Sequence, residues 1–154
     1  MPSSQEERLL DLLRRLRRLG TAFPPIQDMP VTPPQLMLLG WIAEHEGCRV
    51  HDVAAGLGLT PPTVSVSLRR LEQLGLLRRE PDPNDKRALR LFLTSEGKDL
   101  HQRVQTFQHE HARRFLSNLT PAEQETLLTL WTRALEAAEN PDATLQRAHR
   151  LPTI

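Results

Sequence analysis

The sequence lacks the features of a membrane protein, a secreted protein or a disulfide-bonded protein. Its single cysteine, Cys48, cannot form an intramolecular disulfide and cannot form a metal site by itself. No apolar run approaches the roughly 20 residues that span a bilayer, and residues 1–10 lack the basic start and apolar stretch of a secretion signal. We therefore expect a cytoplasmic protein.

The chain also lacks a strong overall charge, since its formal net charge is +1. Hydrophobic residues at 38% and charged residues at 25% are near the globular average, so the 154 residues are expected to fold as one domain. The charge is nevertheless uneven. Residues 60–90 hold seven basic against four acidic side chains, an excess of three positive charges. Such a stretch is expected where a protein meets a phosphate backbone, although charge clusters are often only solvated surface.

Capping-box patterns predict the starts of three helices, at Ser4, Thr32 and Thr120. The first helix ends at Gly20 and carries leucines on one face and arginines on the other, and three prolines make residues 21–31 a connecting loop. The second helix extends to about Glu46. Helical spacing also covers residues 95–118 and 120–138, whereas the tail after Asn140 has weak periodicity.

A short helix over residues 50–57, a tight turn and a helix capped by Thr60 form a helix-turn-helix layout. Val64, Leu68 and Leu71 recur at i, i+4 and i+7, so they are expected to face the core. The side chains left outward are Pro62, Thr63, Ser65, Val66, Arg69, Arg70 and Gln73.

Two strands follow, over residues 76–80 and 88–93, the second alternating Leu89, Leu91 and Leu93 with other side chains. Residues 81–87 between them are dense in turn formers, so we predict a hairpin loop that projects into solvent as a wing.

Residues 32–100 resemble the MarR family of bacterial transcription regulators. The motifs that carry the resemblance are Thr32-x-x-Gln35, Val53-Ala54-x-x-Leu57-Gly58-Leu59-Thr60, Thr63-Val64-Ser65, Leu71-Glu72-x-x-Gly75-Leu76-Leu77-x-Arg79, Asp82-Pro83-Asn84-Asp85-Lys86-Arg87 and Leu93-Thr94-x-x-Gly97.

The resemblance implies a mainly α fold with a small β-wing, in which a winged helix-turn-helix lobe (32–94) is flanked by dimerisation segments (1–31 and 95–140) and a tail (141–154). It implies a homodimer that binds a palindromic site on double-stranded DNA, usually as an effector-responsive repressor, without a cofactor. The leucine-rich stripes at both ends of the chain agree with it, because such surface needs a partner to cover it.

The helix that begins at Thr60 is expected to present its first turns to the major groove. Its candidate DNA-binding residues are Thr60, Pro62, Thr63, Ser65, Val66, Arg69 and Arg70. The family often has arginine where this chain has Val66, which predicts a different operator sequence. The alternative is that these are ordinary solvent-facing side chains.

In the wing, the resemblance implies that Arg87 enters the minor groove while Asp85 orients it. A narrow minor groove concentrates negative potential and attracts a guanidinium. The alternative is a surface ion pair worth about 0–1 kcal/mol. Lys86 in the same loop and Arg79 at its foot are expected to meet DNA, Arg79 at a phosphate.

Phe23, Met29 and Trp41, together with Trp131, are candidates to line a pocket for a small aromatic or phenolic effector, as the family implies; core packing is the simpler account of each. Cys48 has only Arg49 nearby to lower its thiol pKa, so an oxidation sensor is disfavoured. His109 and His111 lie two apart, so on a helix they cannot chelate one metal ion.

Two other classes of protein fit the sequence less well than a DNA-binding regulator. A winged-helix module that binds another protein would not need the basic, arginine-tipped wing. An enzyme would need a phosphate-cradling glycine loop, a nucleophile with its base, or metal-ligand spacing, and the sequence contains none of these patterns.

Overall fold

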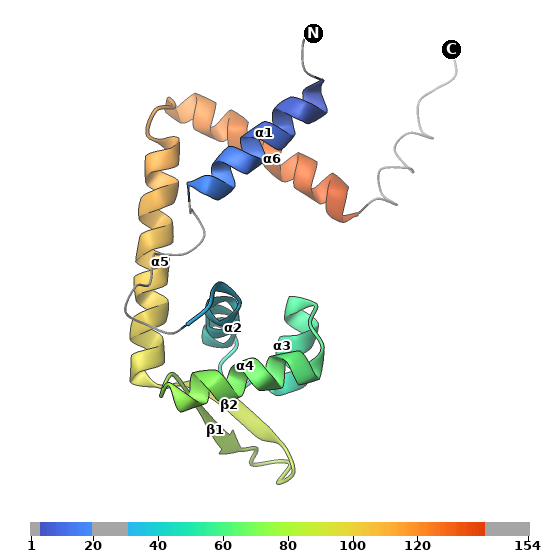
Figure 1. Cartoon of the computed structure of the whole chain (residues 1–154), viewed down its shortest axis with the longest axis vertical. Helices are drawn as coiled ribbons and strands as arrows, with labels where there is room; N and C mark the ends of the chain where they lie inside the picture. Colours follow the sequence, from blue (N-terminus) through green and yellow to red (C-terminus); the bar gives the residue numbers. More distant parts are fainter. Residues whose placement is uncertain (1–3, 20–30, 141–154) are drawn as a thin grey trace, which may run out of the picture. The chain divides into compact units, whose positions relative to one another are not determined.

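Helices account for most of the computed structural model, which describes residues 4–19 and 31–140 (Figure 1). The elements in chain order are α1 (Gln5–Arg18), α2 (Pro33–Glu44), α3 (Val50–Leu57), α4 (Pro61–Gln73), β1 (Leu77–Pro81), β2 (Leu89–Leu93), α5 (Ser95–Leu116) and α6 (Pro121–Glu139). Two compact units divide within α5, at residues 111 and 112. Gly20, residues 21–30 of the predicted connecting loop and the tail after Asn140 lie outside the described residues.

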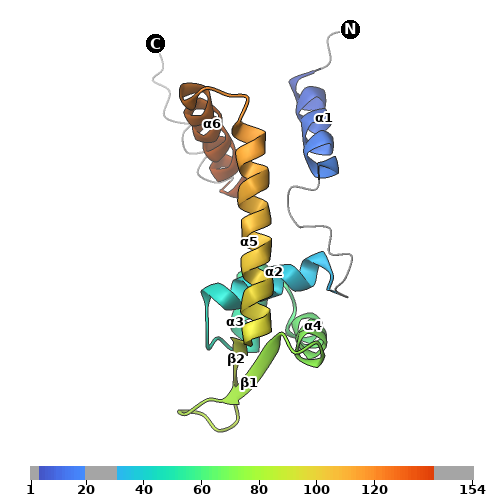
Figure 2. The ribbon, with the colours of Figure 1, turned by 90° about the vertical axis from the view of Figure 1, so that its left-hand side faces the viewer.

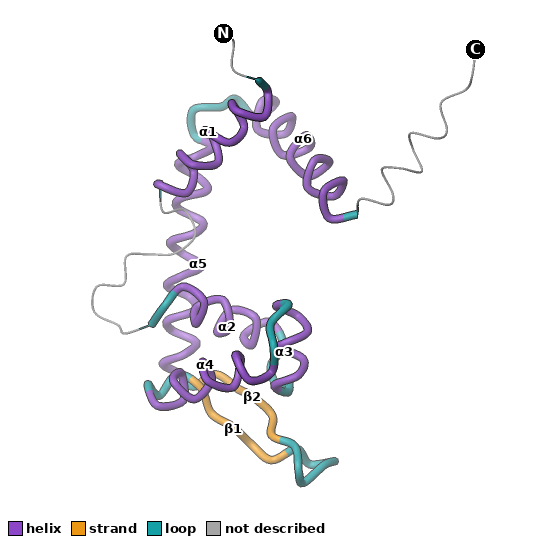
Figure 3. Tube along the Cα trace, turned by 45° about the vertical axis from the view of Figure 1, so that its right-hand side comes forward, coloured by secondary structure: helices purple, strands orange, loops and turns teal. Residues whose placement is uncertain are grey.

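The core of the first unit is formed by α2, α3, α4, the two strands and the start of α5. The expected core positions of α4 are confirmed, because Val64, Leu68 and Leu71 are fully buried. Ile42 from α2 and Val53 from α3 are equally inaccessible, so the helix-turn-helix is packed on both of its helices. Figure 3 shows the helices of this lobe beside the strand pair.

The strands form an antiparallel pair in which Leu77 faces Leu93 and Pro81 faces Leu89 (Figure 2). A third segment joins them, because the Gly47 amide donates to the Leu91 carbonyl at 2.9 Å and the Leu91 amide to the Cys48 carbonyl at 2.8 Å. Leu91 and Leu93 are buried, whereas Leu89, at the loop end of β2, is 44% exposed. The expected leucine alternation thus reaches the core at only two of its three positions.

The capping boxes expected at Ser4, Thr32 and Thr120 are present. The helices that follow the caps Ser4 and Thr120 are α1 and α6, and neither contains a buried residue when the described ranges 4–19 and 31–140 are considered. The exposed large apolar side chains are Leu9, Leu10, Leu12 and Leu13 on α1, Leu19 at its C-cap, and Leu128, Leu130, Trp131 and Leu135 on α6. Each of the two helices therefore carries exposed apolar side chains in the described part of the chain.

None of the helices in the ranges 4–19 and 31–140 has both the length and the apolar character needed to cross a membrane. Within the same ranges, no three or more His, Cys, Asp or Glu side chains lie together in a way that could hold a metal ion.

Candidate nucleic-acid interface

Helix α4 presents a polar first turn on the side away from the core. Thr60 caps the helix, and its hydroxyl lies 2.8 Å from that of Thr63. Pro61 and Pro62 occupy the first two positions, where a missing backbone N–H costs nothing. Thr63 is exposed and Ser65 half-buried, so these hydroxyls are accessible at the start of the helix.

Further along the same face, α4 exposes one apolar side chain and two cations. Val66 is 66% exposed. Arg69 and Arg70 are exposed, and neither forms an ion pair within the described part of the chain. Free guanidinium groups on an exposed helix face are available to phosphates or to base edges.

Arg79, expected at a phosphate, already has a partner in the free protein. Its Nε donates to Oε2 of Glu72 at 3.2 Å, which links β1 to the last turn of α4. The Arg79 side chain is 22% exposed, so a phosphate would have to compete with, or share, the Glu72 carboxylate.

The wing loop between β1 and β2 is closed by backbone hydrogen bonds. The Asp82 amide donates to the Ala88 carbonyl at 3.0 Å, and the Ala88 amide to the Asp85 carbonyl at 2.9 Å. The Asp82 side chain is buried, whereas Lys86 and Arg87 are exposed. The loop therefore holds one acidic side chain inward and presents its two cations outward.

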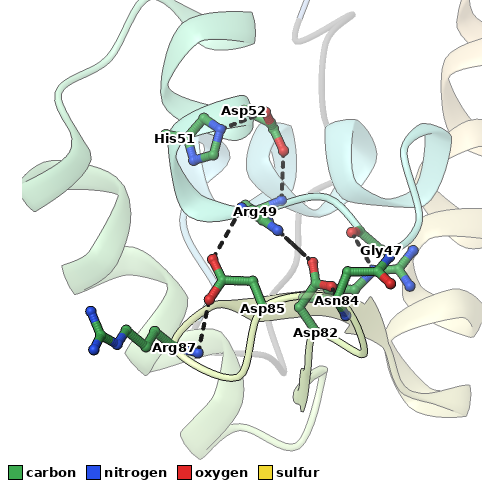
Figure 4. Close-up of polar contacts among 9 residues, drawn as sticks. Gly47, Arg49, His51, Asp52, Asp82, Asn84, Asp85 and Arg87 are labelled. Carbon is green, nitrogen blue, oxygen red and sulfur yellow. Dashed lines mark hydrogen bonds and ion pairs between the residues drawn. The ribbon is translucent and has the colours of Figure 1, made fainter.

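The buried Asp82 is held by Arg49, the N-cap residue of α3, which the sequence patterns did not single out (Figure 4). Nε and Nη2 of Arg49 donate to Oδ2 of Asp82 at 3.2 and 2.7 Å, and Oδ1 of Asp82 accepts the Asn84 amide at 2.9 Å. The Asn84 amide, and after it the Arg49 guanidinium, lower the pKa of Asp82 below its ordinary value.

Asp85 has other partners than the side-chain pairing expected with Arg87. Oδ1 of Asp85 accepts the backbone amide of Arg87 at 3.1 Å, and Oδ2 lies 3.8 Å from Nη1 of Arg49. The Arg87 guanidinium points away from Asp85 in Figure 4. Asp85 thus acts on the backbone at Arg87 and leaves the guanidinium without an ion pair among the described residues.

The protein-family model described as "MarR family" matches residues 29–88. The transcriptional repressor MdtR of Bacillus subtilis (strain 168) is 27% identical over 144 residues, which cover 90% of this chain and 93% of MdtR. The transcriptional regulator HosA of Escherichia coli O111:H- is 30% identical over 125 residues, 81% of this chain and 93% of HosA. The chain belongs to the MarR family.

Solved structures of MarR-like regulators share the fold. A variant of MepR from S. aureus bound to an oligodeoxyribonucleotide is 25% identical with a TM-score of 0.63, covering 88% of this chain and 99% of that chain. PcaV from Streptomyces coelicolor, in complex with its natural ligand, is 27% identical with a TM-score of 0.62. The match covers 90% of this chain and 99% of the PcaV chain. This MarR-family protein is thus a DNA-binding transcription regulator and not an enzyme.

Two other candidate residues of this MarR-family chain are engaged in the lobe. Trp41 stacks on His45 with ring centroids 4.0 Å apart, and a Cβ on Gly56 would lie 2.4 Å from the indole, so Trp41 packs tightly against α3. Burial, followed by the charge of Asp52, raises the pKa of the Cys48 thiol to about 11, which opposes a reactive thiolate. Phe23 and Met29 lie outside the described residues.

Proposed function

We propose that this MarR-family regulator acts as an effector-responsive repressor, a homodimer in which each chain brings one α4 and one wing to half of a palindromic operator. The observation that carries the proposal is the pairing of two exposed cationic surfaces in one lobe: Arg69 and Arg70 on α4, and Lys86 and Arg87 in the wing. A helix and a loop of this kind suit the major groove and the adjacent minor groove respectively.

We propose the following roles for the site residues. Thr63, Ser65 and Val66 read base edges, where Val66 offers an apolar contact that suits a thymine methyl group. Arg69, Arg70 and Lys86 meet phosphates or guanine, and Arg87 enters the minor groove. Thr60 and Pro62 shape the start of the helix at the DNA.

The homodimer rests on the exposed apolar faces of α1 and α6. Single surface leucines are ordinary, but α1 and α6 together expose eight large apolar side chains and have no buried residue in the part of the chain that the structure describes. Such a surface needs a cover. A second copy of the same chain supplies the same apolar faces, as a two-fold interface requires. We therefore assign dimerisation to residues 1–31 and 95–140 and DNA binding to residues 32–94.

The effector is proposed to be a small aromatic or phenolic acid. This rests on relatives: PcaV is described in complex with its natural ligand, and a repressor of a homoprotocatechuate degradative operon from Escherichia coli is 30% identical over 107 residues. Such a ligand would act by favouring a dimer whose lobe spacing does not fit the operator. An aromatic acid that releases bound operator in proportion to its own affinity supports this proposal.

Selection of bound duplexes from a random pool, followed by fluorescence anisotropy at several salt concentrations, tests the proposed function. A palindrome with half-sites about one helical turn apart should be enriched. Its affinity should fall steeply with salt, because counterions are released when cations meet phosphates. No enriched duplex, or an affinity independent of salt, contradicts DNA binding and favours a winged-helix module that binds another protein.

A further inference from the structure

Arg49 lies outside the proposed DNA-contacting set, yet it bonds to both acidic side chains of the wing loop. Its guanidinium reaches Oδ2 of Asp82 through two nitrogens and approaches Oδ2 of Asp85 with the third, at 3.8 Å. The Arg49 side chain is 35% exposed and that of Asp82 is 10% exposed, so the closer pair is largely withdrawn from water. An ion pair with two donors to one carboxylate, partly shielded, is more rigid than an ordinary surface pair.

The second carboxylate oxygen of Asp82 and that of Asp85 each accept a backbone amide. Oδ1 of Asp82 accepts the amide of Asn84 at 2.9 Å, and Oδ1 of Asp85 accepts the amide of Arg87 at 3.1 Å. Each aspartate therefore closes a turn onto the residue two positions later, as Asp and Asn do in tight turns. One guanidinium thus holds two consecutive turns, the second of which ends at Arg87.

The backbone of Arg49 is fixed to the helix-turn-helix. Arg49 is the N-cap residue of α3, and its amide donates to Oδ2 of Asp52 at 2.8 Å. On the preceding residues, the Gly47 carbonyl accepts Nε of Arg90 at 2.9 Å, and Gly47 and Cys48 pair with Leu91 of β2. The start of α3 is thereby bonded to both the base and the loop of the wing.

We propose that Arg49 is a positioning residue for DNA binding: by holding Asp82 and Asp85 together it sets the direction in which the wing presents Arg87. The inference rests on the proposed role of Arg87. Arg49 acts through the two carboxylates, and its own charge is largely neutralised by them, so it makes no phosphate contact of its own.

The proposal predicts loss of wing order in the free protein, which is measured without DNA. ¹⁵N relaxation of the backbone amides should show Asn84 and Arg87 becoming mobile in Arg49→Gln, while the amides of α2 and α4 keep their order. The matched control is Lys98→Gln, which breaks a surface ion pair with Glu46 at 2.8 Å in the same lobe and leaves both wing-loop carboxylates with their partners. Unchanged order at Asn84 and Arg87 overturns the proposal, whether or not the protein binds DNA.

A double-mutant cycle on the selected operator separates positioning from direct contact. Arg49→Gln is expected to weaken binding about tenfold in the native background and by less than about twofold in the Arg87→Ala background, because residues that act through one another are not additive. Equal losses in both backgrounds would mean that Arg49 contacts DNA directly, and would overturn the proposal.

Arg49→Lys tests whether DNA binding depends on the planar donor geometry of the guanidinium or only on its positive charge. Lysine keeps the positive charge, but its ammonium cannot donate to both carboxylates from a planar fork. We expect Arg49→Lys to bind DNA nearly as weakly as Arg49→Gln. Affinity restored to that of the native protein would show that charge alone matters and would contradict the positioning role.

Discussion

Gly97, in the first turn of α5, lies directly against the carbonyl oxygen of Leu76: a Cβ on Gly97 would stand 2.0 Å from that oxygen. The Leu76 carbonyl also accepts the amide of Thr94 at 3.1 Å, and the Thr94 hydroxyl donates to Gly75 at 2.6 Å and accepts the Gly97 amide at 3.1 Å. The start of α5 is thus bonded to the turn between α4 and β1, with backbone on both sides of the contact.

Gly97→Ala is expected to destabilise the protein by about 2 kcal/mol, because the added methyl meets backbone and α5 must shift away from the turn between α4 and β1. A fall in Tm of about 6 °C would correspond to that cost. Thermal unfolding followed by circular dichroism measures it. Gly58→Ala is the comparison, since Gly58 has φ +64° and open space around a new Cβ, leaving only backbone strain of about 1 kcal/mol. Equal Tm values for Gly97→Ala and the native protein would contradict the contact.

Arg87→Ala is expected to weaken operator binding by about 2 kcal/mol, roughly 30-fold in Kd, while leaving Tm unchanged. The substitution keeps the backbone amide that Asp85 accepts and removes only an exposed side chain, so the wing turn is retained. Anisotropy and thermal unfolding measure the two quantities, with Lys98→Ala as the control for loss of one exposed cation. Native affinity in Arg87→Ala would remove the minor-groove role.

Arg79→Gln is expected to lower the salt dependence of DNA binding by about 0.9 in the slope of log K against log salt, the value for one phosphate contact. The companion variant, Glu72→Gln, frees Arg79 from its partner at 3.2 Å, and should keep the slope and tighten binding because a negative charge near DNA is lost. Anisotropy titrations over a range of salt concentrations give both slopes. A slope unaffected by Arg79→Gln would leave Arg79 a purely structural link between β1 and α4.

Acid is expected to loosen the wing only below the ordinary aspartate pKa of about 3.9. The amide of Asn84, and then Arg49, lower the pKa of Asp82, so the carboxylate stabilises the folded wing above the unfolded pKa, and this contribution is lost as pH falls through the lowered folded value. A carboxyl-carbon NMR titration of Asp82 should therefore have a midpoint below the ordinary value, and the midpoint should rise in Arg49→Gln. A midpoint at the ordinary value in the native protein would refute the bonding of Asp82.

The sequence by itself determined the local architecture of the lobe. The signals are the capping box at Thr32, the spacing of Val64, Leu68 and Leu71, and the dense turn formers of residues 81–87. Each of these signals is contained in a short stretch of sequence. Such signals act through backbone geometry that repeats every turn of a helix or every two residues of a strand, so they can be recognised without knowing the fold. They placed the exposed face of α4 and the wing correctly.

Only the tertiary structure decided what the wing is attached to. Arg49 and Asp82 are 33 residues apart, and neither belongs to a periodic pattern that includes the other. The same holds for the close approach of Gly97 to Leu76 and for the ion pair between Arg49 and Asp85. Pairings of this kind depend on how α3, the strands and α5 pack, because packing alone brings distant side chains within bonding distance.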